Sequence, residues 1–376
     1  MSGPSKPTQR TRPVNVAARG GAGRRSRRRP PLLALVLNQI KQPYIGGQAV
    51  IEGVMMRAPS GMSVAVRRPD GSIAIKEGPF TSRLARSKLW KLLGFRGIAT
   101  LVESVALGYR ALSFSAEQQM TEEERAEAAS ASSTLPILIA TAVAIWLFIA
   151  LPQALATWLT SAFGWHIGLS DPTFHLIIGG FKLLVFVAYL LLIRRLKDTR
   201  RVFEYHGAEH KTIHAYERDL PLTVDNVRVQ STLHPRCGTT FLIVVIAVSI
   251  VAGAVAAPLL LPNASGWTGQ LAIFVLRLAL LPLIAAIAFE FQRFTARYCT
   301  HGLARVVLWP GFLFQMITTI EPDDSQMEIA IAAMEAAAWR ERVGDEVPGG
   351  DEPLVFPSLE GLNEALPELR PAPAAA

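Results

Sequence analysis

Histidines in one short segment are the residues whose type and spacing best fit metal chemistry. His206, His210 and His214 recur every four residues, so a helix over this segment places the three imidazoles on one face. Neutral imidazole is the commonest protein ligand for zinc and related ions, and two imidazoles at i and i+4 can bind one ion. The spacing predicts a metal-binding helix; the alternative is a polar, hydrogen-bonded helix at an interface.

Glu209 supplies the carboxylate that a metal-dependent hydrolase needs. It completes His206-x-x-Glu209-His210, the reversed form of the zinc-protease motif. In enzymes with such motifs the histidines bind the ion, and a carboxylate acts as the general base for the attacking water. Glu209 is therefore the candidate catalytic residue, with His206 and His210 as the first two ligands.

The third ligand has three candidates, because zinc accepts imidazole, thiolate and carboxylate. His234 and Cys237 follow the histidine segment closely, and Glu290 lies at the end of an apolar stretch. Three ligands and an open position indicate hydrolysis, whereas His234-x-x-Cys237 also suits a closed, structural four-ligand site. Zinc is the expected ion in either case.

The composition indicates a membrane protein in a reducing compartment. Half of the 376 residues are hydrophobic, and the two cysteines, Cys237 and Cys299, rule out a disulfide scaffold. The net charge of +8 belongs to a tail, because residues 1–31 contain nine Lys or Arg and no acid. The rest of the chain is close to neutral, so no specific nucleic-acid binding is predicted.

Four apolar stretches are each long enough to cross about 30 Å of hydrocarbon as a helix. The predicted fold class is an α-helical polytopic membrane protein with about four transmembrane helices. Lys182 and Arg277 lie inside two of the stretches, where a charge is costly; they are either functional or snorkel to the headgroups. The predicted spans are residues 135–159, 174–193, 239–261 and 271–289.

The distribution of cations predicts the orientation of these spans. The second span is followed by a run of Lys and Arg between residues 194 and 201, whereas residues 160–173 and 262–269 contain neither. The positive-inside rule places the motif loop 194–238 and both termini in the cytoplasm, so the expected location is the plasma membrane. The histidine segment, residues 46–57 and Glu290 then share the cytoplasmic side.

A small cytoplasmic α+β portion is expected beside the spans. Residues 63–77 alternate apolar and polar side chains around Pro69-Asp70-Gly71, which indicates a β-hairpin. Residues 84–115 have the pattern of an amphipathic helix lying on a membrane surface or on a neighbouring domain. The expected order of segments along the chain is a disordered basic tail (1–43), a soluble segment (44–127), a membrane domain (128–342) and a disordered acidic tail (343–376). Within the membrane domain, an interfacial or re-entrant segment (306–320) and a helix (325–342) follow the last span.

Four motifs, occurring in order between about Tyr44 and Arg340, make the chain resemble the YqhQ-like family of bacterial membrane proteins. The resemblance implies a domain of unknown function described as a predicted metal-dependent enzyme, and it names no substrate. His214 and the pair Cys299-x-His301 lie outside the family pattern, as do both tails. The motifs are Gly46-Gly-Gln-Ala-Val-Ile-Glu-Gly-Val-Met55, Tyr205-His-Gly-Ala-Glu-His-Lys211, His234-Pro-Arg-Cys-Gly-Thr-Thr-Phe241 and Pro310-Gly…Gln315…Thr318-Thr319…Glu321-Pro322.

These observations leave three functions open. The first is a metal-dependent hydrolase at the cytoplasmic membrane face, acting on a lipid-linked, peptide or phosphorylated substrate. The second is a non-enzymatic membrane scaffold with a structural metal site, and the third is a lipid-modifying metal oxidase. Membrane lipids are the expected partners. Polar residues of the motifs that are expected to support the ligands or to contact substrate are Gln48, Glu52, Lys211 and Arg236.

Overall fold

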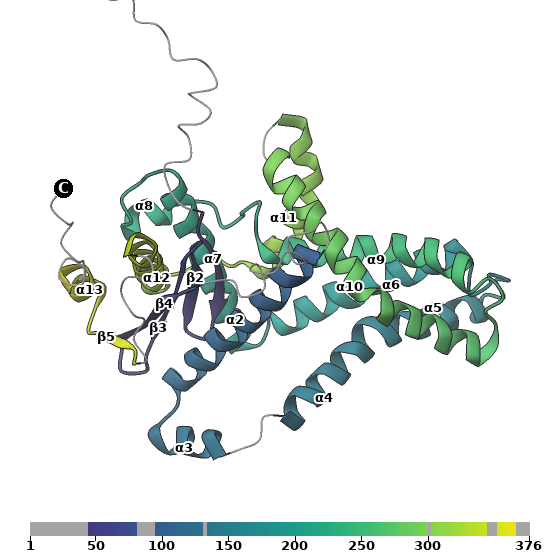
Figure 1. The fold of residues 1–376 in the computed structure, drawn as a ribbon, viewed down its shortest axis with the longest axis horizontal. Helices are drawn as coiled ribbons and strands as arrows, with labels where there is room; N and C mark the ends of the chain where they lie inside the picture. The colour runs from purple at the N-terminus through teal and green to yellow at the C-terminus, as the bar shows by residue number, and fades with distance from the viewer. Residues whose placement is uncertain (1–43, 81–94, 131–133, 300–301, 344–351, 366–376) are drawn as a thin grey trace, which may run out of the picture. The chain divides into compact units, whose positions relative to one another are not determined.

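The computed structural model describes residues 44–80, 95–130, 134–299, 302–343 and 352–365 (Figure 1). The basic tail that we expect to be disordered, residues 1–43, lies outside these ranges. Four helical stretches are long and apolar enough to cross a membrane, as predicted, and the protein is a polytopic helical membrane protein. These stretches are Thr134–Ala162, Pro172–Ile193, Gly238–Leu260 and Gly266–Thr295.

A short π-helical segment interrupts the first of these stretches. Within it, the backbone N–H of Leu151 donates to the carbonyl of Trp146, five residues back. Pro152 follows directly and lacks a backbone donor, so the regular i to i−4 pattern cannot continue through this point. The pieces are α4 (Thr134–Ile145), η3 (Trp146–Ala150) and α5 (Leu151–Ala162).

The other three membrane helices are neighbours in space. Helix α9 (Gly238–Leu260) contacts both α6 (Pro172–Ile193) and α10 (Gly266–Tyr298), and α5 contacts α6. Close approach of α6 and α9 depends on Gly179, because a Cβ at this position would lie 2.6 Å from Ile250 Cδ1. Small residues at such crossings allow apolar helices to pack closely in a membrane.

The predicted hairpin is part of a five-stranded antiparallel sheet, in which strands adjacent in the chain are paired. The hairpin itself is β3–β4, in which Ala65 pairs with Ile75. The strands are β1 (Gly46–Val50), β2 (Gly53–Arg57), β3 (Gly61–Arg67), β4 (Ile73–Pro79) and β5 (Leu354–Phe356).

Strand β5 corrects the expectation that residues 343–376 are disordered. Residues 354–356 pair with β4, and α13 (Leu359–Ala365) follows directly. Leu362 of this helix is buried in the main core. A three-residue strand is stabilised by a partner almost 300 residues away in the chain, and local composition carries no signal for such a pairing.

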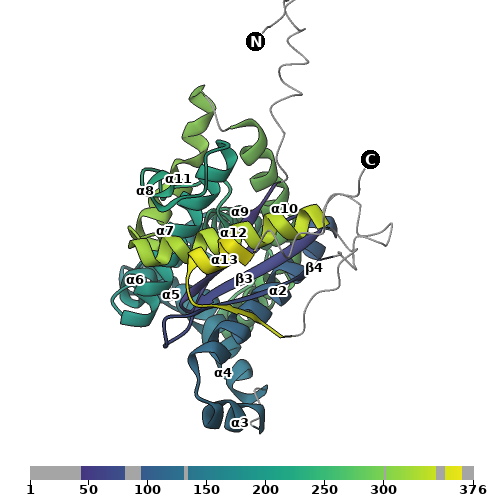
Figure 2. The same ribbon diagram turned by 90° about the vertical axis from the view of Figure 1, so that its left-hand side faces the viewer.

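Helices cover both faces of the sheet, and α12 (Asp324–Val343) lies across one of these faces in Figure 2. Side chains alternate between the faces, as strand geometry requires. Val54 and Ile75 face a core shared with α12 and α7 (Lys197–Glu217), whereas Met55 and Val64 face α2 (Phe95–Gln119). Even Ser63, a polar residue of the predicted alternation, is buried, and its hydroxyl donates to the carbonyl of Ala333 at 2.6 Å.

Helix α2 is the described part of the predicted amphipathic segment, since residues 84–94 lie outside the described ranges. Its buried side chains contact the sheet, and the helix also contacts α10. Val102, Val105 and Tyr109 lie on another side of α2 and are more than half exposed. The helix therefore packs on neighbouring elements and also presents an apolar surface to the surroundings.

The remaining helices are short, and among them α8 contacts α7. The segment that we predict to be interfacial or re-entrant forms η4 (Gly302–Leu308) and α11 (Trp309–Thr318), and α11 contacts α9 and α6. Helix α7 ends in a Schellman-type turn, in which Leu220 N–H donates to Ala215 and Asp219 has a φ of +55°. Two further short helices are α3 (Glu122–Ser130) and α8 (Val224–Arg228).

Candidate metal centre

His206 and His210 of α7 and Cys237 at the start of α9 form a group of potential metal ligands. One ligand atom from each of the three residues lies within 4.8 Å of the other two. His206 Nε2 is 3.2 Å from Cys237 Sγ, and the two imidazole centroids are 4.4 Å apart. The i, i+4 spacing on α7 thus places both rings beside a thiol that comes from a different helix.

Backbone carbonyls fix the orientation of both imidazoles. His206 Nδ1 lies 2.9 Å from the carbonyl oxygen of Thr318, and His210 Nδ1 contacts the carbonyl oxygen of Thr232. In a neutral ring, an Nδ1–H that donates to a carbonyl leaves Nε2 with a free lone pair, as in most histidine–metal sites. His210 Nε2 is buried without a hydrogen-bond partner among the described residues. A cation bound at this position would satisfy this atom.

Cys237 lies in an environment that favours the thiolate. Burial acts to raise the pKa of its thiol, but the neighbouring His210 and the hydroxyl and amide of Thr239 lower the pKa overall. Cys237 is also the N-cap of α9, where Thr239 N lies 3.4 Å from the sulfur, and Gln292 donates to its carbonyl at 3.1 Å. Two imidazoles and a thiolate form a donor set that suits zinc.

Glu209 is buried between α7 and strand β1. A Cβ at Gly47 of β1 would lie 2.8 Å from the carboxyl carbon of Glu209, so the strand backbone passes directly over this side chain. Burial raises the pKa of Glu209 to about 8, while nearby His206 acts in the opposite direction. The carboxyl group lines the same cavity as both histidines and Cys237.

Gln315 of α11 positions the loop that carries Cys237. Its buried side chain accepts from His234 N at 2.8 Å, donates to His234 O at 2.9 Å and donates to Thr240 Oγ1 at 3.0 Å. We did not predict this role, nor that of the Thr318 carbonyl, from the sequence. Gln315 and Thr318 both belong to the fourth motif, and membership of this motif is the feature of the sequence that points to them.

The sequence makes His234 a candidate third ligand beside His206 and His210. In the structure it groups with His214 and Glu217, and not with His206, His210 and Cys237. Its ring lies 4.8 Å from that of His214 and 5.6 Å from that of His210, measured between centroids. Glu217 in turn forms an ion pair with Arg236, whose guanidinium lies 4.6 Å from the Tyr44 ring centroid. A cation already neutralises the one carboxylate of this second group.

Glu290 is not a member of either group. Its carboxylate receives two hydrogen bonds from the Arg96 guanidinium, with Arg96 Nε 2.6 Å from Oε1. This ion pair joins α10 to α2. The expectation that Glu290 is a ligand is therefore not supported by its position, since helix–helix packing determines its partner.

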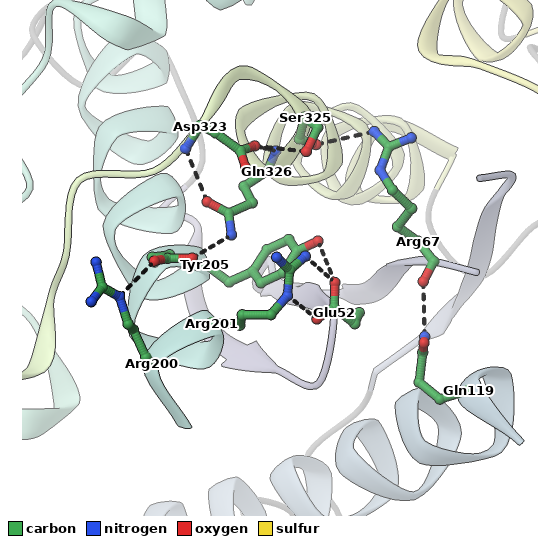
Figure 3. Close-up of polar contacts among 10 residues, drawn as sticks. Glu52, Arg67, Gln119, Arg200, Arg201, Tyr205, Asp323, Ser325 and Gln326 are labelled. Atoms are coloured by element: carbon green, nitrogen blue, oxygen red, sulfur yellow. Dashed lines mark hydrogen bonds and ion pairs between the residues drawn. The ribbon is translucent and has the colours of Figure 1, made fainter. Parts of the chain in front are cut away.

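Glu52 and Lys211 also have structural partners. Glu52 lies in the β1–β2 turn with a φ of +51°, binds the Arg201 guanidinium with both oxygens and accepts from Tyr205 Oη at 3.3 Å (Figure 3). Lys211 Nζ donates to the carbonyl of Arg228 at 2.7 Å and forms an ion pair with Glu321. The contact between Glu52 and Arg201 fixes α7 to the sheet, and the contact between Lys211 and the Arg228 carbonyl fixes α7 to α8.

The intramembrane cations have polar partners within the bundle. Arg277 of α10 lies 2.8 Å from His175 Nδ1 of α6, and Lys182 of α6 donates to Ser249 Oγ at 3.1 Å. Both contacts join neighbouring membrane helices. Each intramembrane cation thus has one polar partner on another membrane helix.

A cavity of about 1190 Å³ opens beside the first group. Its wall includes His206, Glu209, His210 and Cys237, together with Gln48 of β1. Other parts of its wall come from α2, α6, α9, α10 and α11. The volume is somewhat larger than that of a usual small-molecule site, so a ligand can reach the candidate metal ligands and Glu209 together.

The fold and site together define a polytopic helical membrane protein with a sheet-based module that carries a candidate metal centre. Comparison with known sequences identifies the family. Residues 94–339 match the family described as protein of unknown function DUF1385, and the chain belongs to this family. The chain is also 33% identical over 307 residues to the uncharacterized protein YqhQ of Bacillus subtilis (strain 168), covering 77% of this chain and 90% of the relative. No solved structure matches the chain.

Proposed function

We propose that the protein is a metal-dependent hydrolase that acts at the cytoplasmic face of the plasma membrane. The observation that carries the proposal is the convergence of ligand atoms from His206, His210 and Cys237 beside the buried carboxyl of Glu209, in the wall of a large cavity. Zinc is the ion that this donor set fits best, with one coordination position left for water.

The roles of the residues follow from their positions. His206, His210 and Cys237 would hold the zinc ion, which would supply a water with a pKa lowered to about 7 and a Lewis acid for the bond to be cleaved. A cation held beside Glu209 would lower the raised pKa of its carboxyl and favour the carboxylate. The carboxylate would then accept the proton of the attacking water and transfer it to the leaving group, while the water oxygen becomes part of the acid product. The Thr318 and Thr232 carbonyls keep the two imidazoles in the ligating tautomer.

Charge supports the proposed orientation in the membrane. Helix α6 leads into α7 through a stretch that contains Arg194, Arg195 and Lys197, while the connections at residues 160–173 and 262–269 have no Lys or Arg. The positive-inside rule then places α7 and the metal centre in the cytoplasm, with both termini. The exposed Val102, Val105 and Tyr109 of α2 fit the same membrane surface.

Metal analysis combined with complementation tests the proposal. Purified wild-type protein is expected to contain about one zinc ion per chain. His206→Ala is expected to lose most of the metal, whereas Glu209→Gln keeps the ligands and the shape of the side chain, so it retains the metal. Both variants are expected to fail in complementing a strain that lacks the gene.

The same experiment addresses the second candidate, a membrane scaffold with a structural metal site. The buried His–His–Cys set supports that candidate too, since structural zinc sites use these donors. A structural ion has no need of a base at position 209. Full complementation by Glu209→Gln, together with failure of His206→Ala, therefore rejects the hydrolase and leaves the scaffold.

A further inference from the structure

The cavity beside the candidate metal centre has two kinds of wall. One part is apolar and comes from the membrane helices, and another part carries arginines. We infer that the hydrolase acts on a membrane lipid with a phosphate headgroup, which binds in this cavity with its acyl chain against the apolar part. The inference rests on the proposed function and names its substrate class.

The apolar part is formed by the ends of membrane helices that lie nearest to α7. Helix α6 contributes Phe186, Leu190 and Ile193 in its last two turns, and α9 contributes Phe241 and Leu242 in its first two turns. Leu242 is 44% exposed. Because these residues continue the apolar surfaces of helices that cross the membrane, an acyl chain can lie in the cavity and remain in contact with the bilayer.

The charged part has an excess of cations, although Arg236 is already paired with Glu217. Of the described residues that line the cavity, Glu209 is the one acid, against four arginines. Arg293 and Arg297 are exposed and lie one turn apart on α10, so their guanidinium groups share one side of the helix. The other two are Arg57 and Arg236.

The first turn of α9 adds further positive potential to this part of the wall. Gly238 and Thr239, its first two residues, line the cavity beside Cys237. Backbone N–H groups at a helix N-terminus favour phosphate, although that of Thr239 is directed at Cys237 Sγ. Arginine binds phosphate in a bidentate geometry. A headgroup phosphate is therefore stabilised close to Cys237 and Glu209, while a zwitterionic headgroup gains less from this wall.

Direct binding measurements test the inference on the full chain in detergent. The probe is a fluorescent long-chain phosphatidic acid, and saturable binding is expected. Arg293→Gln combined with Arg297→Gln is expected to weaken binding about tenfold, which equals about 1.4 kcal/mol. Both side chains are exposed, so the substitutions leave the fold intact.

A matched control separates recognition in the cavity from general attraction to basic surfaces. Arg195→Gln combined with Lys197→Gln removes two exposed cations near the end of α6 that do not line the cavity. This double variant is expected to bind the lipid like the wild type. An equal loss in both double variants overturns the inference, because the effect then reflects nonspecific surface charge.

Competition distinguishes a lipid from its separate chemical parts. Unlabelled phosphatidic acid is expected to displace the probe, whereas inorganic phosphate and phosphatidylcholine at the same concentration are not. Displacement by inorganic phosphate shows that the apolar wall contributes nothing, and displacement by phosphatidylcholine shows that charge is not recognised. Either result overturns the inference, as does the absence of saturable binding.

The metal content of the same preparations keeps this inference distinguishable from the proposed function. His206→Ala removes a ligand and leaves the arginines and the apolar wall in place, so it is expected to bind the lipid without metal. Metal-containing protein that does not bind the lipid rejects the substrate class alone. Lipid binding by wild-type protein that never contains metal rejects the hydrolase alone.

Discussion

Gly47 is the residue of strand β1 that allows the backbone to lie directly over Glu209. A methyl group at this position would be 2.8 Å from the carboxyl carbon, which is closer than non-bonded atoms approach. Gly47→Ala is therefore expected to displace the Glu209 carboxyl and to abolish complementation, while His206 and His210 still bind metal. Zinc content and complementation are the two measurements.

The neighbouring glycine provides the control for this prediction. At Gly46 the nearest atom to an added methyl group is on the Tyr44 ring at 3.9 Å, an ordinary contact distance. Gly46→Ala is expected to behave like the wild type in both measurements. Equal behaviour of the two variants contradicts the assigned role of Gly47.

Substitutions of Cys237 and His234 give a second prediction for single residues, because the structure places these two side chains in different groups of potential metal ligands. Cys237→Ala is expected to lower zinc affinity by about 10-fold or more, as loss of a group that supports or forms a metal site typically does. His234→Ala is expected to retain the zinc, since Gln315 bonds to its backbone and not to its ring. Loss of zinc in both variants indicates a single site that includes His234.

The sequence predicts the parts of the site that depend on local geometry. His206, Glu209 and His210 lie on consecutive turns of one helix, so their spacing alone brings them together. The position of Glu290 could not be inferred in this way, because its partner Arg96 lies almost 200 residues earlier and is brought near by helix packing. The supporting carbonyls of Thr232 and Thr318 are backbone atoms, so the residue type does not reveal their role, although Thr318 belongs to the fourth motif.

Among the elements, the contact between α7 and the segment after α11 determines where His206 lies. Gly207 of α7 approaches Ile320 so closely that a Cβ would be 2.1 Å from its carbonyl oxygen. Gly207→Ala is expected to separate the helix from this segment and to destabilise the protein by about 1–3 kcal/mol, as overpacking does. It is also expected to weaken zinc binding, because Thr318 O moves away from His206.

Thermal unfolding and zinc affinity of the purified protein measure these two effects. Gly180→Ala in α6 is the control, because no atom lies within 4 Å of an added Cβ there. Alanine also has a higher helix propensity than glycine, so this variant is expected to be at least as stable as the wild type. A Gly207→Ala protein with unchanged stability contradicts the close contact.

The elements that the sequence predicts well are those with a long, regular pattern. Four apolar stretches and a histidine-bearing helix follow from hydropathy and from i, i+4 spacing. Strands β1 and β2 carry no clear alternation, because residues 53–57 are buried on both faces or nearly so. The turn between them contains Glu52 with a positive φ, a conformation stabilised by the distant Arg201 and not by a local turn residue.

For the whole molecule, the proposed orientation gives a topology that reporter fusions can measure. Fusions at Ala162 and Gly266 are expected to report the outside of the plasma membrane, since the connections there have no Lys or Arg. Fusions at Asp219 and after Ala365 are expected to report the cytoplasm. A cytoplasmic signal at Gly266 contradicts the arrangement of four crossings.

The sheet-based module is discontinuous in the chain, and this affects the order of its assembly during synthesis. Strands β1 to β4 are made first, whereas α12 and β5, which cover and extend them, are made after all four membrane helices. A ribosome adds about 5–20 residues per second, so the nascent sheet waits for roughly 12 to 60 seconds with apolar surface uncovered. A chain released before residue 324 lacks this cover, so premature termination is expected to yield an aggregation-prone fragment.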